Sequence, residues 1–74
     1  MIGTQMTYKS GLKRKIFVAD GITDTFNCSD TMALSNDYLV FIGGVEQTDI
    51  TTRSGNSVVT NTILDDGTRI MVIN

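Results

Sequence analysis

The alternation of apolar and polar residues along the chain predicts short β-strands separated by turns. β-Branched Thr, Ile and Val are abundant, and their stiff side chains suit a pleated strand better than a helix. Turn-forming Gly, Asn, Asp and Ser cluster about every 8–14 residues, a spacing typical of all-β sandwiches and barrels. We therefore expect an all-β fold: a small antiparallel β-sandwich or barrel of about six to seven short strands, preceded by an extended N-terminal arm.

The predicted strands follow from this pattern segment by segment. They run from residue 12 or 13 to 19, 23 to 28, 38 to 42, 45 to 48 or a little beyond, about 57 to 62, and 69 to 73. Phe26 and Cys28 share one face of their strand and are expected to point inward, as is Val58 in the fifth strand. Residues 29–35 have modest helical character, and we expect a single helical turn there.

The segment from residue 38 to 42 is apolar at every position and ends at Gly43-Gly44. Glycine adopts positive φ without a Cβ clash, so this pair suits a type I′ turn between two antiparallel strands. An unbroken apolar strand is typical of one that is covered on both faces. The predicted second apolar face, a candidate subunit or capsid interface, consists of Tyr38, Val40, Ile42, Met71 and Ile73. The alternative is that both faces of these strands lie inside the sandwich.

The length of 74 residues predicts one β-domain, residues 13–74, with residues 1–12 as the arm. A domain of this size buries only about 60% of its unfolded surface. The single cysteine, Cys28, forms no internal disulfide, and the chain has no histidine for a zinc site. A small core without such a cross-link favours oligomerisation or docking on a larger body.

Charge is unevenly distributed along the chain. Residues 1–15 carry four cations and no acid, and residues 16–74 carry eight acids and two arginines, so +4 and −6 sum to −2. The basic cluster consists of Lys9, Lys13, Arg14 and Lys15. It is either a solvated strand edge or a docking site for an acidic neighbour. We expect no nucleic-acid partner, because no aromatic stacking platform lies beside the cluster and the acidic remainder would repel phosphates.

Candidate chemistry is sparse. The neighbouring carboxylates Asp65-Asp66 precede Gly67 and are expected to form a turn. Cys28 is expected to be a small apolar filler of the core rather than a nucleophile. We therefore expect no enzymatic activity, no cofactor and no metal site. No apolar run approaches the length of a membrane span and no signal peptide is recognisable, so we also expect no membrane partner.

Several positions over about residues 16–74 resemble a known sequence pattern. The matching residues are Phe17, Ala19, Asp20, Gly21, Thr25 and Phe26, then Asp37, Leu39, Val40, Phe41, Gly44, Val45, Gln47, Gly55, Asp66, Gly67, Ile70 and Val72. Together they resemble a small β-sandwich domain of tailed-phage virion structural proteins. The chain departs from that pattern at Gly43, where the family usually has Asn, at Thr68, where it usually has Asp, and at Ile50, which stands in place of an aromatic residue.

The resemblance implies a bacteriophage virion structural protein that is made in the bacterial cytoplasm and resides in the virion. The leading hypothesis is a capsid decoration, or cement, protein that binds the major capsid protein and stabilises the assembled head. It implies a homo-oligomer as well, with a trimer favoured over a dimer. One alternative is a tail-associated adaptor or tail-fibre domain that attaches a fibre or contacts the host surface. Another is a carbohydrate-binding β-module, although the chain has only two tyrosines and no tryptophan for sugar stacking.

Overall fold

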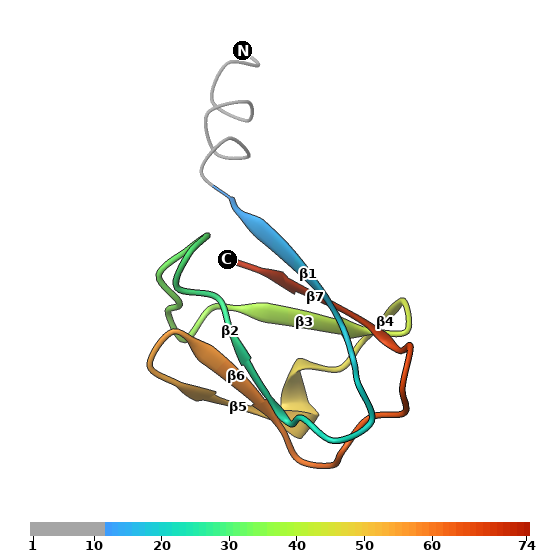
Figure 1. Cartoon of the computed structure of the whole chain (residues 1–74). Helices are drawn as coiled ribbons and strands as arrows, with labels where there is room; N and C mark the ends of the chain where they lie inside the picture. Colours follow the sequence, from blue (N-terminus) through green and yellow to red (C-terminus); the bar gives the residue numbers. More distant parts are fainter. Residues whose placement is uncertain (1–11) are drawn as a thin grey trace.

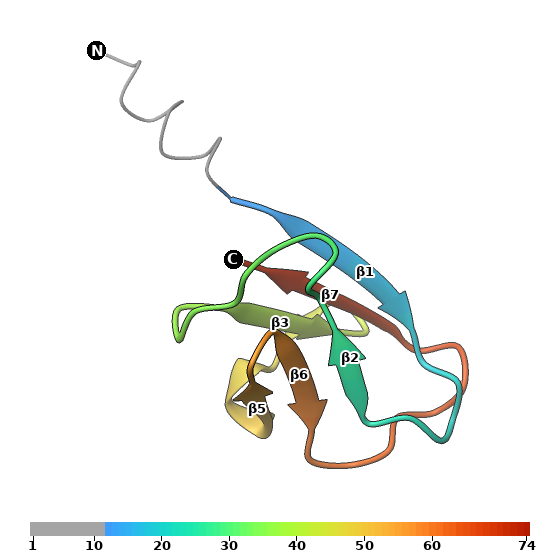
Figure 2. The ribbon, with the colours of Figure 1, turned by 60° about the vertical axis from the view of Figure 1, so that its left-hand side comes forward.

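The computed structural model describes residues 12–74, which form two antiparallel sheets (Figure 1). One sheet has the strand order β1-β7-β3-β4 and the other the order β2-β6-β5. The strands are β1 (Arg14–Val18), β2 (Thr25–Asn27), β3 (Leu39–Ile42), β4 (Val45–Glu46), β5 (Thr51–Ser54), β6 (Ser57–Thr60) and β7 (Arg69–Ile73), and a 3-10 helix, η1 (Thr48–Ile50), precedes β5. The predicted all-β fold is confirmed, with the three-stranded sheet lying across one face of the four-stranded sheet (Figures 1 and 2).

The core lies between the sheets and is built by residue alternation. Val40 pairs with Val72 and Ile42 with Ile70 between β3 and β7, and all four side chains are buried. The second sheet contributes Val58 from β6. The remaining core residues are Ala19, Phe26, Cys28, Met32, Leu34 and Tyr38. Burial of a Val or Ile side chain contributes about 1.5–3 kcal/mol, so this layer supplies much of the stability of so small a domain. The inward orientation predicted for Phe26, Cys28 and Val58 is confirmed.

The β3–β4 hairpin closes as the sequence predicts. Gly43 and Gly44 have φ values of 59° and 85°, and a type I′ turn requires positive φ at both central residues. Ile42 then pairs with Val45 and Phe41 with Glu46. The hairpin places the short strand β4 at one edge of the four-stranded sheet, while β1 forms the opposite edge.

The fourth strand is shorter than predicted because a side chain replaces a backbone partner. After β4 ends at Glu46, the buried Val40 N–H donates to the Thr48 hydroxyl at 2.8 Å. Val40 O accepts from Gln47 N–H, also at 2.8 Å. Both backbone groups of Val40 are therefore satisfied without a longer β4, and the chain turns into η1.

Two further local features can be compared with the predictions. Strand β5 was not predicted, because its sequence Thr-Thr-Arg-Ser has no apolar alternation, and it forms by pairing with β6 along its whole length. The single helical turn expected within residues 29–35 is present as one hydrogen-bonded turn that begins at Cys28. Its N–H groups of Thr31 and Met32 both donate to Cys28 O at 2.9 Å, and no helix follows.

Candidate functional site

The four-stranded sheet exposes its outer face, which points away from the core. Because Ile70 and Val72 point inward, Arg69, Met71 and Ile73 of β7 must point outward. The register then defines three rows across β1, β7 and β3: Arg14, Ile73 and Leu39; Ile16, Met71 and Phe41; and Val18 and Arg69 beside Gly43. We call these residues the outer face. Ile16 and Leu39 are 45% and 43% exposed, so large apolar side chains meet solvent there.

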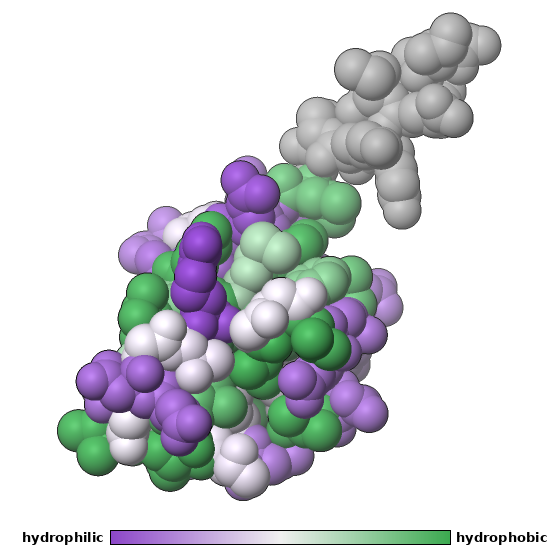
Figure 3. All heavy atoms as spheres, turned by 90° about the vertical axis from the view of Figure 1, so that its right-hand side faces the viewer, coloured by the Kyte–Doolittle hydropathy of each residue, from purple (hydrophilic) through white to green (hydrophobic). Residues whose placement is uncertain are grey.

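The centre of the outer face is hollowed. A depression of about 770 Å³ is lined by Ile16, Phe41 and Met71 and by the glycine turns of the hairpin and of residues 67–68. Figure 3, which views the molecule from the right-hand side of Figure 1, shows green hydrophobic residues interleaved with purple polar ones. Arg69 lines the depression and Arg14 lies beside Ile73. The surface thus combines an apolar centre with cations at its margin, a composition suited to an apolar partner that carries carboxylates.

The predicted second apolar face is partly wrong. Met71 and Ile73 do lie on the outer face, half-buried, but Tyr38, Val40 and Ile42 are core residues. Their opposite neighbours Leu39 and Phe41 occupy the outer face instead. A strand that is apolar at every position carries no signal for which alternate set points inward. The sequence therefore located the strand but not its orientation.

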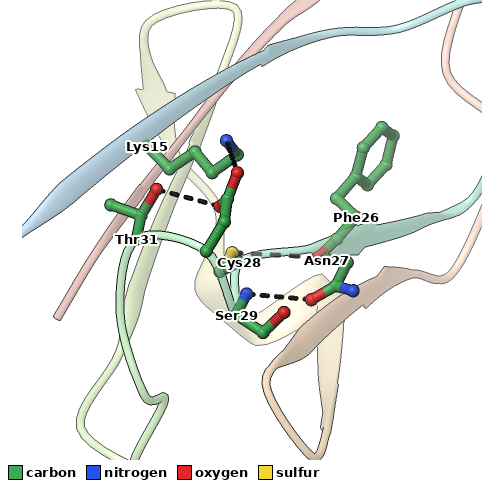
Figure 4. Close-up of polar contacts among 7 residues, drawn as sticks. Lys15, Phe26, Asn27, Cys28, Ser29 and Thr31 are labelled. Carbon is green, nitrogen blue, oxygen red and sulfur yellow. Dashed lines mark hydrogen bonds and ion pairs between the residues drawn. The ribbon is translucent and has the colours of Figure 1, made fainter.

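The basic cluster is divided by the structure. Lys9 lies outside the described residues, whereas Lys13 and Arg14 are exposed at the start of β1. Lys15 points to the inner side, where its Nζ is 3.1 Å from Asp30 Oδ2 (Figure 4). The same Nζ is 5.4 Å from the centre of the Phe17 ring. The hydrogen bond from Lys15 lowers the pKa of Asp30. Lys15 therefore forms a surface ion pair with Asp30, whereas Lys13 and Arg14 are the other described cations of the basic cluster.

Cys28 lies within the core near this ion pair. Its Sγ donates to Phe26 O at 3.8 Å (Figure 4), and burial raises the pKa of the thiol. The thiolate, which is the reactive form of cysteine, is therefore disfavoured. Across residues 12–74, no three Cys, Asp or Glu side chains gather as a metal ion would require. In the same part of the chain, no helix is long and apolar enough to cross a membrane.

No family model, curated protein or solved structure matches the chain. The geometry of the outer face indicates what it can bind. It lies on three hydrogen-bonded strands, so its side chains are held at fixed spacings. Such a surface can bind another protein by burying apolar area, with Arg14 and Arg69 selecting an acidic partner.

Proposed function

We propose that the protein is a bacteriophage virion structural protein of the capsid decoration type, which docks on the assembled head through its outer face. The observation that carries the proposal is the row of Ile16, Met71 and Phe41 across three strands, with Arg14 and Arg69 at its margin. Soluble monomers rarely expose large apolar patches, so a face of this kind favours a protein partner. The resemblance to virion β-domains supplies the setting, and the major capsid protein is the proposed partner.

The proposed mechanism is stabilisation by mass action. A protein that binds the assembled lattice and not its free subunits shifts the equilibrium toward the lattice. The apolar residues of the outer face provide the burial, at about 25 cal/mol per Å² removed from water. Arg14 and Arg69 meet carboxylates on the capsid surface, so attachment weakens as salt is raised.

The protein content of purified particles tests this proposal. For a decoration protein we expect a copy number comparable with that of the major capsid protein. A content of only a few copies per particle identifies a tail adaptor or fibre domain instead. Absence from the particles contradicts both assignments.

A pair of variants tests the docking face itself. Met71→Glu places a carboxylate at the centre of the outer face, whereas Ile63→Glu places one on an exposed loop residue away from it. Both variants should fold, as judged by circular dichroism. Met71→Glu should fail to co-sediment with particles that lack the protein, and Ile63→Glu should bind as the unmodified protein does. Equal binding by the two variants contradicts docking through the outer face.

A further inference from the structure

Strand β1 has the longest open edge of the described domain. The other edge strands are β4, with two residues, β2, with three, and β5, with four. Arg53 ties β5 to the neighbouring loop, because its guanidinium donates to Asn36 Oδ1 at 3.0 Å and to Leu34 O at 3.4 Å. Strand β1 has five residues and, among the strands of residues 12–74, pairs only with β7 (Figures 1 and 2). An unpaired edge of this length is a template for another strand.

The pairing with β7 identifies which backbone groups of β1 remain free. Lys13 and Asn74 exchange two hydrogen bonds of 3.1 and 3.0 Å, and Ala19 N–H donates to Thr68 O at 2.8 Å. Because hydrogen-bonded and non-bonded pairs alternate along an antiparallel ladder, Lys15 and Phe17 also bond toward β7. Arg14, Ile16 and Val18 therefore direct both N–H and C=O to the open edge. Their side chains belong to the outer face.

Charge selects the occupant of this edge. Strand β1 begins at Arg14, directly after Lys13, and is followed by Asp20, whose carboxylate accepts hydrogen bonds from two backbone N–H groups. A second β1 that runs antiparallel brings the basic start of each strand beside the acidic end of the other. A parallel second copy would place cations against cations.

The register of such a pair is restricted as well. A two-fold axis at Arg14 or Lys15 places like charges opposite each other. An axis at Phe17 or Val18 leaves Arg14 without a partner inside the strand. An axis at Ile16 pairs Ile16 with its copy and Arg14 with Val18 of the other chain. The free backbone N–H and C=O groups of all three residues then have hydrogen-bond partners on both strands.

We propose that two copies of the chain associate through antiparallel pairing of β1 about a two-fold axis at Ile16. The inference extends the proposed function, because it adds a self-association of the docking protein and specifies the strand that forms it. The two four-stranded sheets become one continuous sheet, and the two outer faces become a single docking surface. The product is a dimer rather than the trimer that the family resemblance favours.

Engineered disulfides test the register. Directly opposed residues in a hydrogen-bonded pair have Cα atoms about 5.5 Å apart, within the range that a disulfide spans. Ile16→Cys should therefore give a cross-linked dimer under mild oxidation, resolved on a non-reducing gel. Val18→Cys is the matched control, since Val18 is more exposed, at 64% against 45%, yet lies opposite Arg14 of the other copy. Unmodified protein has only the buried Cys28 and should not cross-link. Equal cross-linking by the two variants, or none by Ile16→Cys, overturns the proposed pairing.

The mass in solution gives a second test. Light scattering over a concentration series should give twice the 8.1 kDa of one chain. Ile16→Lys places two cations at the axis and should give a folded monomer, whereas Ile63→Lys, at a similarly exposed loop position, should remain dimeric. A monomer at every concentration, or an Ile16→Lys dimer, overturns the inference. A dimer that binds no particle contradicts the proposed function alone, and a monomer that binds particles contradicts only the pairing.

Discussion

Gly21 lies against Asp66, so that a Cβ placed on Gly21 would stand 3.5 Å from the Cβ of Asp66. Nearby, Ala19 N–H donates to Thr68 O and Ala19 O accepts from Gly67 N–H, both at 2.8 Å. The turn after β1 and the turn before β7 thus form a single packed corner. The turn geometry of this corner therefore accounts for the residue types of Ala19, Gly21, Asp66 and Gly67.

Replacing Gly21 tests this corner. Its φ is +83°, a left-handed conformation that costs a residue with a Cβ about 1–2 kcal/mol. We expect Gly21→Ala to lower the free energy of unfolding in urea by about this amount. Gly21→Asn should cost less, because asparagine tolerates positive φ better than alanine does. Unchanged stability of Gly21→Ala, or a larger loss for Gly21→Asn, contradicts the turn geometry.

Because the core lies between the sheets, removing one methylene group should lower the free energy of unfolding more at a core position than at an exposed one. Ile70 is completely buried, so Ile70→Val should lower the free energy of unfolding by about 0.5–1.5 kcal/mol. Ile63→Val makes the same chemical change at a residue that is 49% exposed and should stay within about 0.5 kcal/mol of the unmodified protein. Thermal or urea unfolding measures both. Equal costs at the two sites would place Ile70 outside the core.

We expect the Thr48 hydroxyl to contribute measurably to the stability of the fold, because it accepts a hydrogen bond from a buried N–H group. Thr48→Val retains the shape of the side chain but leaves the buried Val40 N–H without its acceptor. An unsatisfied buried donor costs about 1–3 kcal/mol, which urea unfolding should detect. Thr52→Val on exposed β5 is the control and should change stability little. A Thr48→Val protein as stable as the control would show that this hydrogen bond is not needed.

Asp20 predicts a dependence of stability on pH. The N–H of Ile22, the hydroxyl of Thr23 and the N–H of Thr23 donate to its carboxylate and lower its pKa to about 2. Since the pKa is lower in the folded state than in the unfolded chain, the stabilisation is complete above about pH 4 and is lost as the pH falls toward 2. Asp20→Asn should flatten this part of the stability curve, measured by urea unfolding across that range.

The control for the pH prediction is Asp49→Asn, at an exposed carboxylate that accepts no hydrogen bond in residues 12–74. This variant should show the same change of unfolding free energy with pH as the unmodified protein. If Asp20→Asn also keeps the full slope, the hydrogen-bonded loop is not its source. Asp30 and Glu46 also have lowered pKa values, so the slope of Asp20→Asn is expected to decrease rather than vanish.

The fold was predictable where local chemistry determines the backbone. Gly43-Gly44 fixes a hairpin, and the alternation around Phe26 and Val58 fixes which side chains are buried. Strand β5 was not predictable, because its polar residues are held by pairing with β6 and not by burial. The end of β4 depends on the Thr48 hydroxyl, a tertiary contact that no local pattern reveals.

The candidate site was predictable only in part. Met71 and Ile73 were expected on an apolar outer surface, and both lie there. The sequence does not show which alternate residues of 38–42 point inward. Polar residues would mark the solvent side, and none of them occurs inside the apolar run. Leu39 and Phe41 were missed for the same reason. The ion pair of Lys15 depends on Asp30, fifteen residues away in the chain, and no spacing rule joins them.

Imaging of intact particles that carry a label on this protein tests its proposed role most directly. If the protein decorates the capsid, the label should be distributed over the head at junctions between capsid subunits. The label should disappear from the head when Met71→Glu replaces the unmodified protein. Label confined to the tail, or particles without label, would contradict attachment to the capsid.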